Sequence, residues 1–86
     1  MNRSYKKVLL GLGFDSKDGH LRITKGENFR LFGGSEETHG LMQEKAIKFN
    51  EQLDKRHKHL EDINEKEFRE ISKVIGLKMP EEKQEK

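Results

Sequence analysis

The sequence contains no cysteine and no tryptophan, and proline occurs once in its 86 residues. The absence of cysteine excludes disulfides, thiolate metal sites and cysteine nucleophiles. Apolar residues are scarce: they make up 30% of the chain, charged residues make up 40%, and the mean hydropathy is −1.05. The longest apolar run, from Val8 to Leu12, is far shorter than the ~20 residues of a membrane-spanning helix. A multi-domain enzyme, a membrane span and a large enclosed pocket are therefore excluded.

The first seven residues are basic but lack the apolar stretch and small-residue cleavage site of a secretory signal. We therefore expect a soluble cytoplasmic protein without membrane contact. A chain of this length buries only about 60% of the surface that its unfolded form exposes. We expect one small domain over residues 1–80 and a disordered charged tail at 81–86.

Charge and glycine divide the chain into two halves of different construction. Residues 1–34 contain seven basic residues (Lys or Arg) and three acidic residues (Asp or Glu). Residues 35–86 contain eleven basic and thirteen acidic residues. Six of the eight glycines lie in the first 34 residues. The boundary falls at Gly33–Gly34, and neither half is long enough to be a separate domain.

Apolar residues alternate with period two in the first half, as is typical of strands with one buried face. Strands are expected over three ranges: about 7–14, 20–24 and 29–32. Turn-forming residues, including Asp18–Gly19 and Gly26, separate them. Because the connections are short, an antiparallel β-meander is the simplest sheet. Four residues are expected on its inner face: Leu21, Ile23, Phe29 and Leu31.

The second half has helical spacing. Apolar residues recur three and four positions apart and predict one long amphipathic helix over about 36–62, with Ser35 as its N-cap. Asn64 is placed to cap a short helix over about 65–75, and Glu67 completes a capping box. Gly76 is placed to end that helix. The sequence thus predicts an α+β domain in which a small sheet precedes an αα-hairpin.

The first functional hypothesis is a non-enzymatic protein-interaction or self-associating module. The apolar seam of the long helix is longer than a short sheet can cover, since a six-residue strand spans about 20 Å. We expect Met42, Phe49 and Leu53 to anchor a protein partner or a second copy in a homodimer.

The second hypothesis is weak, sequence-tolerant binding of single-stranded nucleic acid through the outer sheet face. That face is expected to carry His20, Arg22, Arg30 and Phe32, with arginines to contact phosphates and an aromatic ring to stack on a base. An ordinary solvated sheet face has a similar composition, so the pattern alone does not decide between them.

The sequence gives little support for metal binding, anion binding or catalysis. His57 and His59 are two apart and would point in nearly opposite directions on a helix, so no metal or cofactor is expected. Glu36 and Glu37 would repel an anion from the glycine pair before the long helix. No nucleophile with a recognisable partner is present, and we expect no catalytic residues.

Overall fold

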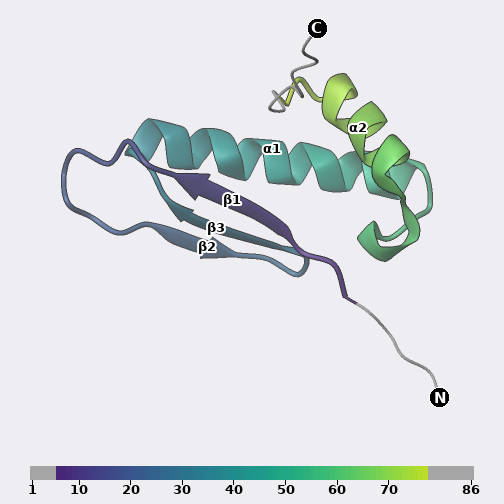
Figure 1. Cartoon of the computed structure of the whole chain (residues 1–86), viewed down its shortest axis with the longest axis horizontal. Helices are drawn as coiled ribbons and strands as arrows, with labels where there is room; N and C mark the ends of the chain where they lie inside the picture. Colours follow the sequence, from purple (N-terminus) through teal and green to yellow (C-terminus); the bar gives the residue numbers. More distant parts are fainter. Residues whose placement is uncertain (1–5, 78–86) are drawn as a thin grey trace, which may run out of the picture.

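The computed structural model describes residues 6–77, in which a three-stranded sheet is covered on one face by a long helix (Figure 1). The elements follow in this order: β1 (Leu9–Gly13), β2 (Ile23–Lys25), β3 (Phe29–Gly33), α1 (Glu36–Lys55), the 3₁₀ turn η1 (Leu60–Asp62) and α2 (Glu65–Val74). The α+β class is as expected. The tail expected at 81–86 lies outside the described residues.

The sheet is mixed, so the expected antiparallel meander is wrong. Its strand order is β1–β3–β2: β3 lies between the other two strands, parallel to β1 and antiparallel to β2. The loop over residues 14–22 crosses the end of β3 to join the two outer strands. Nine residues easily span two strand spacings of about 4.8 Å each, so this loop does not force its flanking strands to pair.

Each side chain of β2 lies on the face of the sheet opposite to the one expected. Thr24 pairs with Leu31, which is 3% exposed, and therefore shares the face that α1 covers. Ile23 pairs with Phe32 on the other face, and Ile23 is exposed. Leu21 is exposed as well, whereas Leu31 is inside as predicted.

Helix α1 begins at its predicted cap but ends seven residues before the predicted boundary. The Ser35 hydroxyl accepts a hydrogen bond from the Thr38 backbone N–H at 3.1 Å. At the other end, His57 has a φ of 56°, and Lys58 N–H donates to Leu53 O at 3.0 Å. This left-handed turn closes the helix in the way that glycine usually does.

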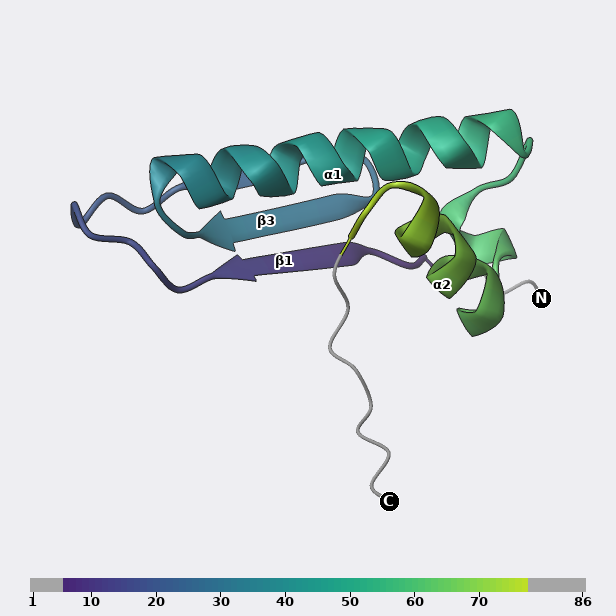
Figure 2. The ribbon, with the colours of Figure 1, turned by 90° about the horizontal axis from the view of Figure 1, so that it is seen from above.

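Helix α2 matches its predicted bounds to within one residue, and both of its predicted end signals are present. Asn64 Oδ1 accepts from Glu67 N–H at 2.9 Å, and Gly76 follows the last turn with a φ of 77°. The expected capping box does not form because the Glu67 carboxylate binds Arg56 and Lys58 instead. The nine residues between the helices include η1, and α2 lies across the end of α1 (Figures 1 and 2).

The hydrophobic core lies where α1, η1 and α2 meet. Its buried members are Phe49, Leu53, Leu60, Ile63, Ile71 and Ile75. The rings of Phe49 and Phe68 are tilted, with their centroids 5.3 Å apart. Ser72 is fully buried beside this cluster, and its hydroxyl has no hydrogen-bond partner among the described residues.

Candidate functional site

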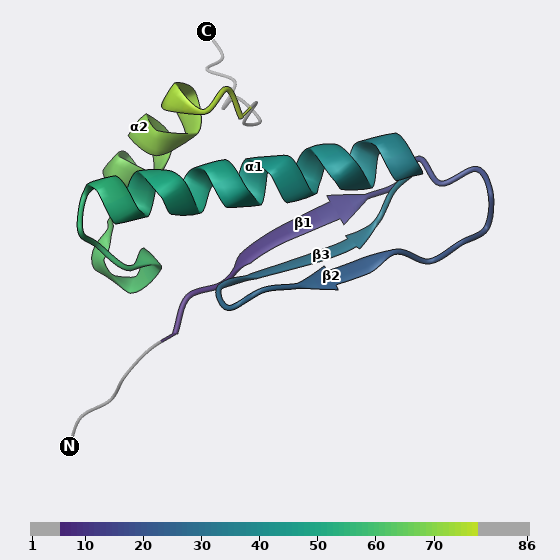
Figure 3. The same cartoon turned by 180° about the vertical axis from the view of Figure 1, so that it is seen from behind.

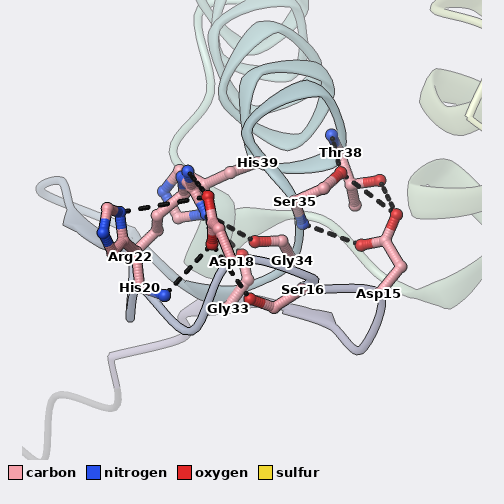
Figure 4. A network of polar contacts seen from close by, with 10 residues as sticks. All are labelled: Asp15, Ser16, Asp18, His20, Arg22, Gly33, Gly34, Ser35, Thr38 and His39. Carbon is pink, nitrogen blue, oxygen red and sulfur yellow. Dashed lines mark hydrogen bonds and ion pairs between the residues drawn. The ribbon is translucent and has the colours of Figure 1, made fainter.

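Polar side chains gather where the 14–22 loop meets the start of α1, and Figure 4 shows them from close by. We call this group the loop–helix network. It comprises Asp15, Ser16, Asp18, His20, Arg22, Gly33, Gly34, Ser35, Thr38 and His39. The network joins the loop, the end of β3 and the first turn of α1, so it fixes the path of the chain across the sheet.

Asp15 caps α1 from the loop. Its carboxylate accepts hydrogen bonds from the backbone N–H of Ser35 at 2.8 Å and from the Thr38 hydroxyl at 2.7 Å. These two donors hold the pKa of Asp15 below its usual value. The negative charge also lies at the positive end of the helix dipole, which stabilises the helix start.

Asp18 pairs with Arg22 on the other side of the network. The Arg22 guanidinium donates to both Asp18 carboxylate oxygens, at 2.8 and 3.3 Å, and also to Gly34 O at 3.2 Å. His20 N–H donates to the same carboxylate at 3.1 Å. The Arg22 contact, with the His20 bond second, holds the pKa of Asp18 well below its usual range.

His39 is 5% exposed, and both of its ring nitrogens are hydrogen-bonded. Nδ1 lies 2.8 Å from Gly33 O, which can only accept, so Nδ1 carries a proton. In the neutral ring, Nε2 then accepts from the Thr24 hydroxyl at 2.8 Å. Gln43 Nε2 donates to that hydroxyl oxygen at 2.9 Å. His39 thus ties the sheet to α1 rather than offering a free base.

Glycine allows the backbone to pass closely where β1 ends beside the turn into α1. Gly33 and Gly34 have φ values of 80° and 86°, which side chains rarely tolerate. A Cβ on Gly13 would lie 2.6 Å from Gly34 Cα. The glycine pair therefore forms a sharp turn against which the backbone of β1 packs closely.

The loop–helix network therefore supports the fold. Its carboxylates and the ring nitrogens of His39 all take part in hydrogen bonds within the network or with its neighbours. Over residues 6–77, no three His, Asp or Glu side chains are grouped so that they could hold a metal ion.

Several exposed apolar side chains lie on the sheet face turned away from α1, which we call the outer face. Figures 1 and 3 show that neither described helix lies over it. Leu10, Leu12 and Ile23 lie on this face, and Val8, Phe14 and Leu21 adjoin the ends of these strands in the chain. All six are exposed, from 46% for Val8 to 88% for Phe14. We call these six residues the apolar patch.

Phe32 lies at the centre of the apolar patch. Its Cα neighbours are Leu12 on one side and Ile23 on the other, so three apolar residues form a row across the sheet. Arg30 and Lys25 pair in a neighbouring row. The outer face thus carries an apolar row next to a basic one.

A second apolar surface is a groove of about 620 Å³ between β1, α1 and the end of α2. Its lining includes Leu10, Leu41, Met42, Phe68 and Leu77. The groove opens beside β1, which lies at the edge of the sheet. Leu10 therefore belongs to the apolar patch and to the rim of this groove.

The predicted partner anchors of the long helix lie mainly inside the chain. Phe49 and Leu53 are 1% and 2% exposed in the core, and Met42 is half-buried in the wall of the groove. A partner cannot reach the first two while the fold is closed, because η1 and α2 already cover that part of the helix.

The four residues predicted to bind nucleic acid do not form one surface. Phe32 and Arg30 share the outer face, but Arg30 also donates to the backbone oxygens of Gly26 and Phe29. Arg22 points to the Gly33–Gly34 turn, and His20 lies in the 14–22 loop. Of these four residues, only Arg30 and Phe32 lie together on the outer face, as predicted.

The apolar patch differs from the prediction, because the period-two alternation predicts that the apolar side chains of the first strand, like Leu21 and Ile23, face the buried side of the sheet. The remaining members carried a signal: the even-numbered residues from Val8 to Phe14 are all apolar, and the odd-numbered positions include Gly11 and Gly13. Small residues on one face of a strand leave room for a close neighbour. A Cβ on Gly11 would lie 2.8 Å from Leu31, which identifies the packed face.

No protein-family model, no curated protein and no solved structure matches the chain. Within residues 6–77, no helix combines the length and the apolar character needed to cross a membrane.

Proposed function

We propose that the chain is a non-enzymatic protein-interaction module that associates with itself through the apolar patch. The observation that supports this proposal is that Leu10, Leu12 and Ile23 are exposed on a sheet face that no described element covers, with the exposed Val8, Phe14 and Leu21 next to the strand ends. Burial of apolar surface contributes about 25 cal/mol per Å², so covering this face favours association. The apolar patch replaces the helix seam as the proposed contact surface.

Sedimentation velocity over a range of protein concentrations tests the proposal. We expect the weight-average sedimentation coefficient to rise with concentration, and the variant Leu12→Lys/Ile23→Lys to remain at the monomer value. The matched control is Ile47→Lys/Val74→Lys, which changes two equally exposed residues on the helices. A wild-type chain that stays monomeric at every concentration contradicts self-association. A loss of association in the control contradicts the choice of surface.

Binding of single-stranded nucleic acid remains a second candidate, because Arg30 and Lys25 are Cα neighbours on the face that holds Phe32. A cation beside an aromatic ring suits a phosphate followed by a stacked base. Salt-sensitive binding of a mixed-sequence oligonucleotide that Lys25→Glu/Arg30→Glu abolishes is the expected result. Arg22→Glu serves as a control, since that side chain is engaged by Asp18. Equal binding by the double variant and the wild type contradicts this candidate.

A further inference from the structure

Within the described part of the chain, strand β1 has a free edge. Leu9 N–H donates to Asn28 O at 2.8 Å, in register with the parallel pair Leu9–Phe29. In a parallel ladder, alternate residues direct both backbone groups to the same side. Leu10 and Leu12 therefore direct their N–H and C=O groups away from β3. Among the residues that the structure describes, no strand pairs with that side of β1.

The residues around β1 are complementary to a second copy running in the opposite direction. Gly11 is the centre of the apolar segment from Val8 to Phe14, Lys7 precedes this segment and Asp15 follows it. Antiparallel pairing about Gly11 places Lys7 of one copy beside Asp15 of the other, so unlike charges adjoin, although Lys7 Nζ also donates to Ile63 O and Asp15 accepts from Ser35 and Thr38 within each copy. Parallel pairing would instead place like charges side by side, which is destabilising.

The same register matches the apolar side chains and the free backbone groups. Leu10 lies opposite Leu12 of the second copy, and Val8 lies opposite Phe14. Since Leu10 and Leu12 are the residues with outward N–H and C=O groups, each such pair exchanges two hydrogen bonds. Gly11 faces Gly11 across the axis as a non-hydrogen-bonded pair.

We propose that two copies of the chain pair through β1, antiparallel and centred on Gly11. The two sheets then form one continuous six-stranded sheet with α1 of each copy on the same side. The pairing removes the free edge, and unprotected edges readily recruit other strands. This inference rests on the proposed self-association but places its contact at the β1 edge: Leu10 and Leu12 of the apolar patch meet across the axis, whereas Ile23 lies on the opposite edge strand and stays exposed.

Disulfide trapping tests the register, because the chain has no cysteine of its own. Leu10→Cys and Leu12→Cys are prepared separately, mixed and oxidised, and the products are identified by intact mass. A hydrogen-bonded antiparallel pair has a Cα separation of about 5.5 Å, which a disulfide spans. In a dimer of Leu10→Cys alone, the two thiols lie on diagonal neighbours about 7–8 Å apart, at or beyond that limit. We expect at least fivefold more cross-linked dimer in the mixture than in either variant alone.

Other cross-linking patterns overturn the proposal. Efficient dimerisation of Leu10→Cys alone, or of Leu12→Cys alone, assigns a different register. If no mixture cross-links while sedimentation shows a dimer, self-association is retained but β1 pairing is wrong. If the chain is monomeric at every concentration, both proposals fail, and the free edge is left for a strand of another protein.

A second pair of variants isolates the backbone contribution. Leu10→Pro removes an N–H that faces the free edge and leaves the ladder with β3 intact, whereas Leu10→Val retains that N–H. We expect the dimer dissociation constant to rise about tenfold or more in Leu10→Pro, since two hydrogen bonds are lost by symmetry. Leu10→Val should remain close to the wild type. Equal dissociation constants for the two folded variants contradict strand pairing.

Discussion

The Asp15 carboxylate accepts hydrogen bonds from both the backbone N–H and the hydroxyl of Ser35, at 2.8 and 3.1 Å. Twenty residues separate the two in sequence, so a loop that follows the first strand completes the cap of α1. Ser35 is itself the N-cap and bonds Thr38. The helix start therefore depends on a side chain from outside the helix.

Loss of this external cap should destabilise the chain. In Asp15→Ala, Ser35 N–H and the Thr38 hydroxyl lose their acceptor, so the midpoint of thermal unfolding should fall. Asp15→Asn retains an acceptor oxygen but lacks the negative charge, and its midpoint should lie between those of Asp15→Ala and the wild type. Circular dichroism at 222 nm measures both. Unchanged midpoints contradict the capping role.

The close passage of the backbone at Gly13 predicts opposite effects for two glycine substitutions. Gly13→Ala places a Cβ against the backbone of Gly34 and should cost about 1–3 kcal/mol of unfolding free energy. Gly40→Ala lies within α1 with no atom near its added Cβ, and should stabilise by about 0.5–1 kcal/mol. Urea denaturation separates the two. Similar effects of both changes contradict the packing argument.

The hydrogen bond between Thr24 and His39 gives a third prediction about stability. Thr24→Val keeps the side-chain shape but removes the hydroxyl that donates to His39 Nε2, leaving a buried acceptor without its partner. The cost should be about 1–3 kcal/mol, while Thr24→Ser should stay close to the wild type. The histidine ring resonances in an NMR spectrum also report the loss of the bond. An unperturbed ring in Thr24→Val contradicts the assignment.

Ser72 predicts a stabilising substitution. Its hydroxyl is buried and unpaired within the described part of the chain. Because an unsatisfied buried hydroxyl is costly, Ser72→Ala should raise the free energy of unfolding by about 1 kcal/mol. Ser72→Val also removes the hydroxyl but adds a branched side chain within a helix. Chemical denaturation gives both values, and a less stable Ser72→Ala overturns the prediction.

Acid should destabilise the fold through its hydrogen-bonded carboxyl groups. The pKa values of Asp15, Asp18 and Glu67 are all lowered, the last by hydrogen bonds from Lys58 and Arg56. The unfolded chain thus binds more protons, and the stability present above the ordinary pKa values of about 4 is lost as the pH falls through the folded values. Thermal midpoints measured from neutral to acid pH should decline below about pH 5. Asp18→Asn should flatten this decline, and an unchanged curve contradicts the contribution of Asp18.

Local signals in the sequence located most of the elements. Ser35, Asn64 and Gly76 each act as predicted because a cap is a contact between near neighbours, and short side chains or a missing Cβ satisfy it. The predicted end of α1 was wrong because the helix stops before His57, which takes the left-handed conformation that usually favours glycine. The apolar spacing continues through Leu60, so periodicity alone does not mark the break.

Strand order and the functional surface depend on contacts between distant residues. Nothing in segment 15–19 indicates that β3 will lie between its flanking strands. Thr24 faces inward because His39 and Gln43 on α1 bond its hydroxyl, a pairing that no spacing rule contains. Because Thr24 faces inward, its neighbour Ile23 lies on the outer face and becomes part of the apolar patch.

The position of β3 between β1 and β2 imposes an order of assembly. Lys25 pairs with Arg30 five positions away, whereas Leu9 pairs with Phe29 twenty positions away. Closing the longer loop costs more chain entropy, so the β2–β3 hairpin forms first and β1 docks on it. During synthesis on the ribosome, β1 emerges before its partner strand exists. Its backbone groups are therefore unpaired, and Leu9 lacks its packing partners, until the rest of the chain has followed.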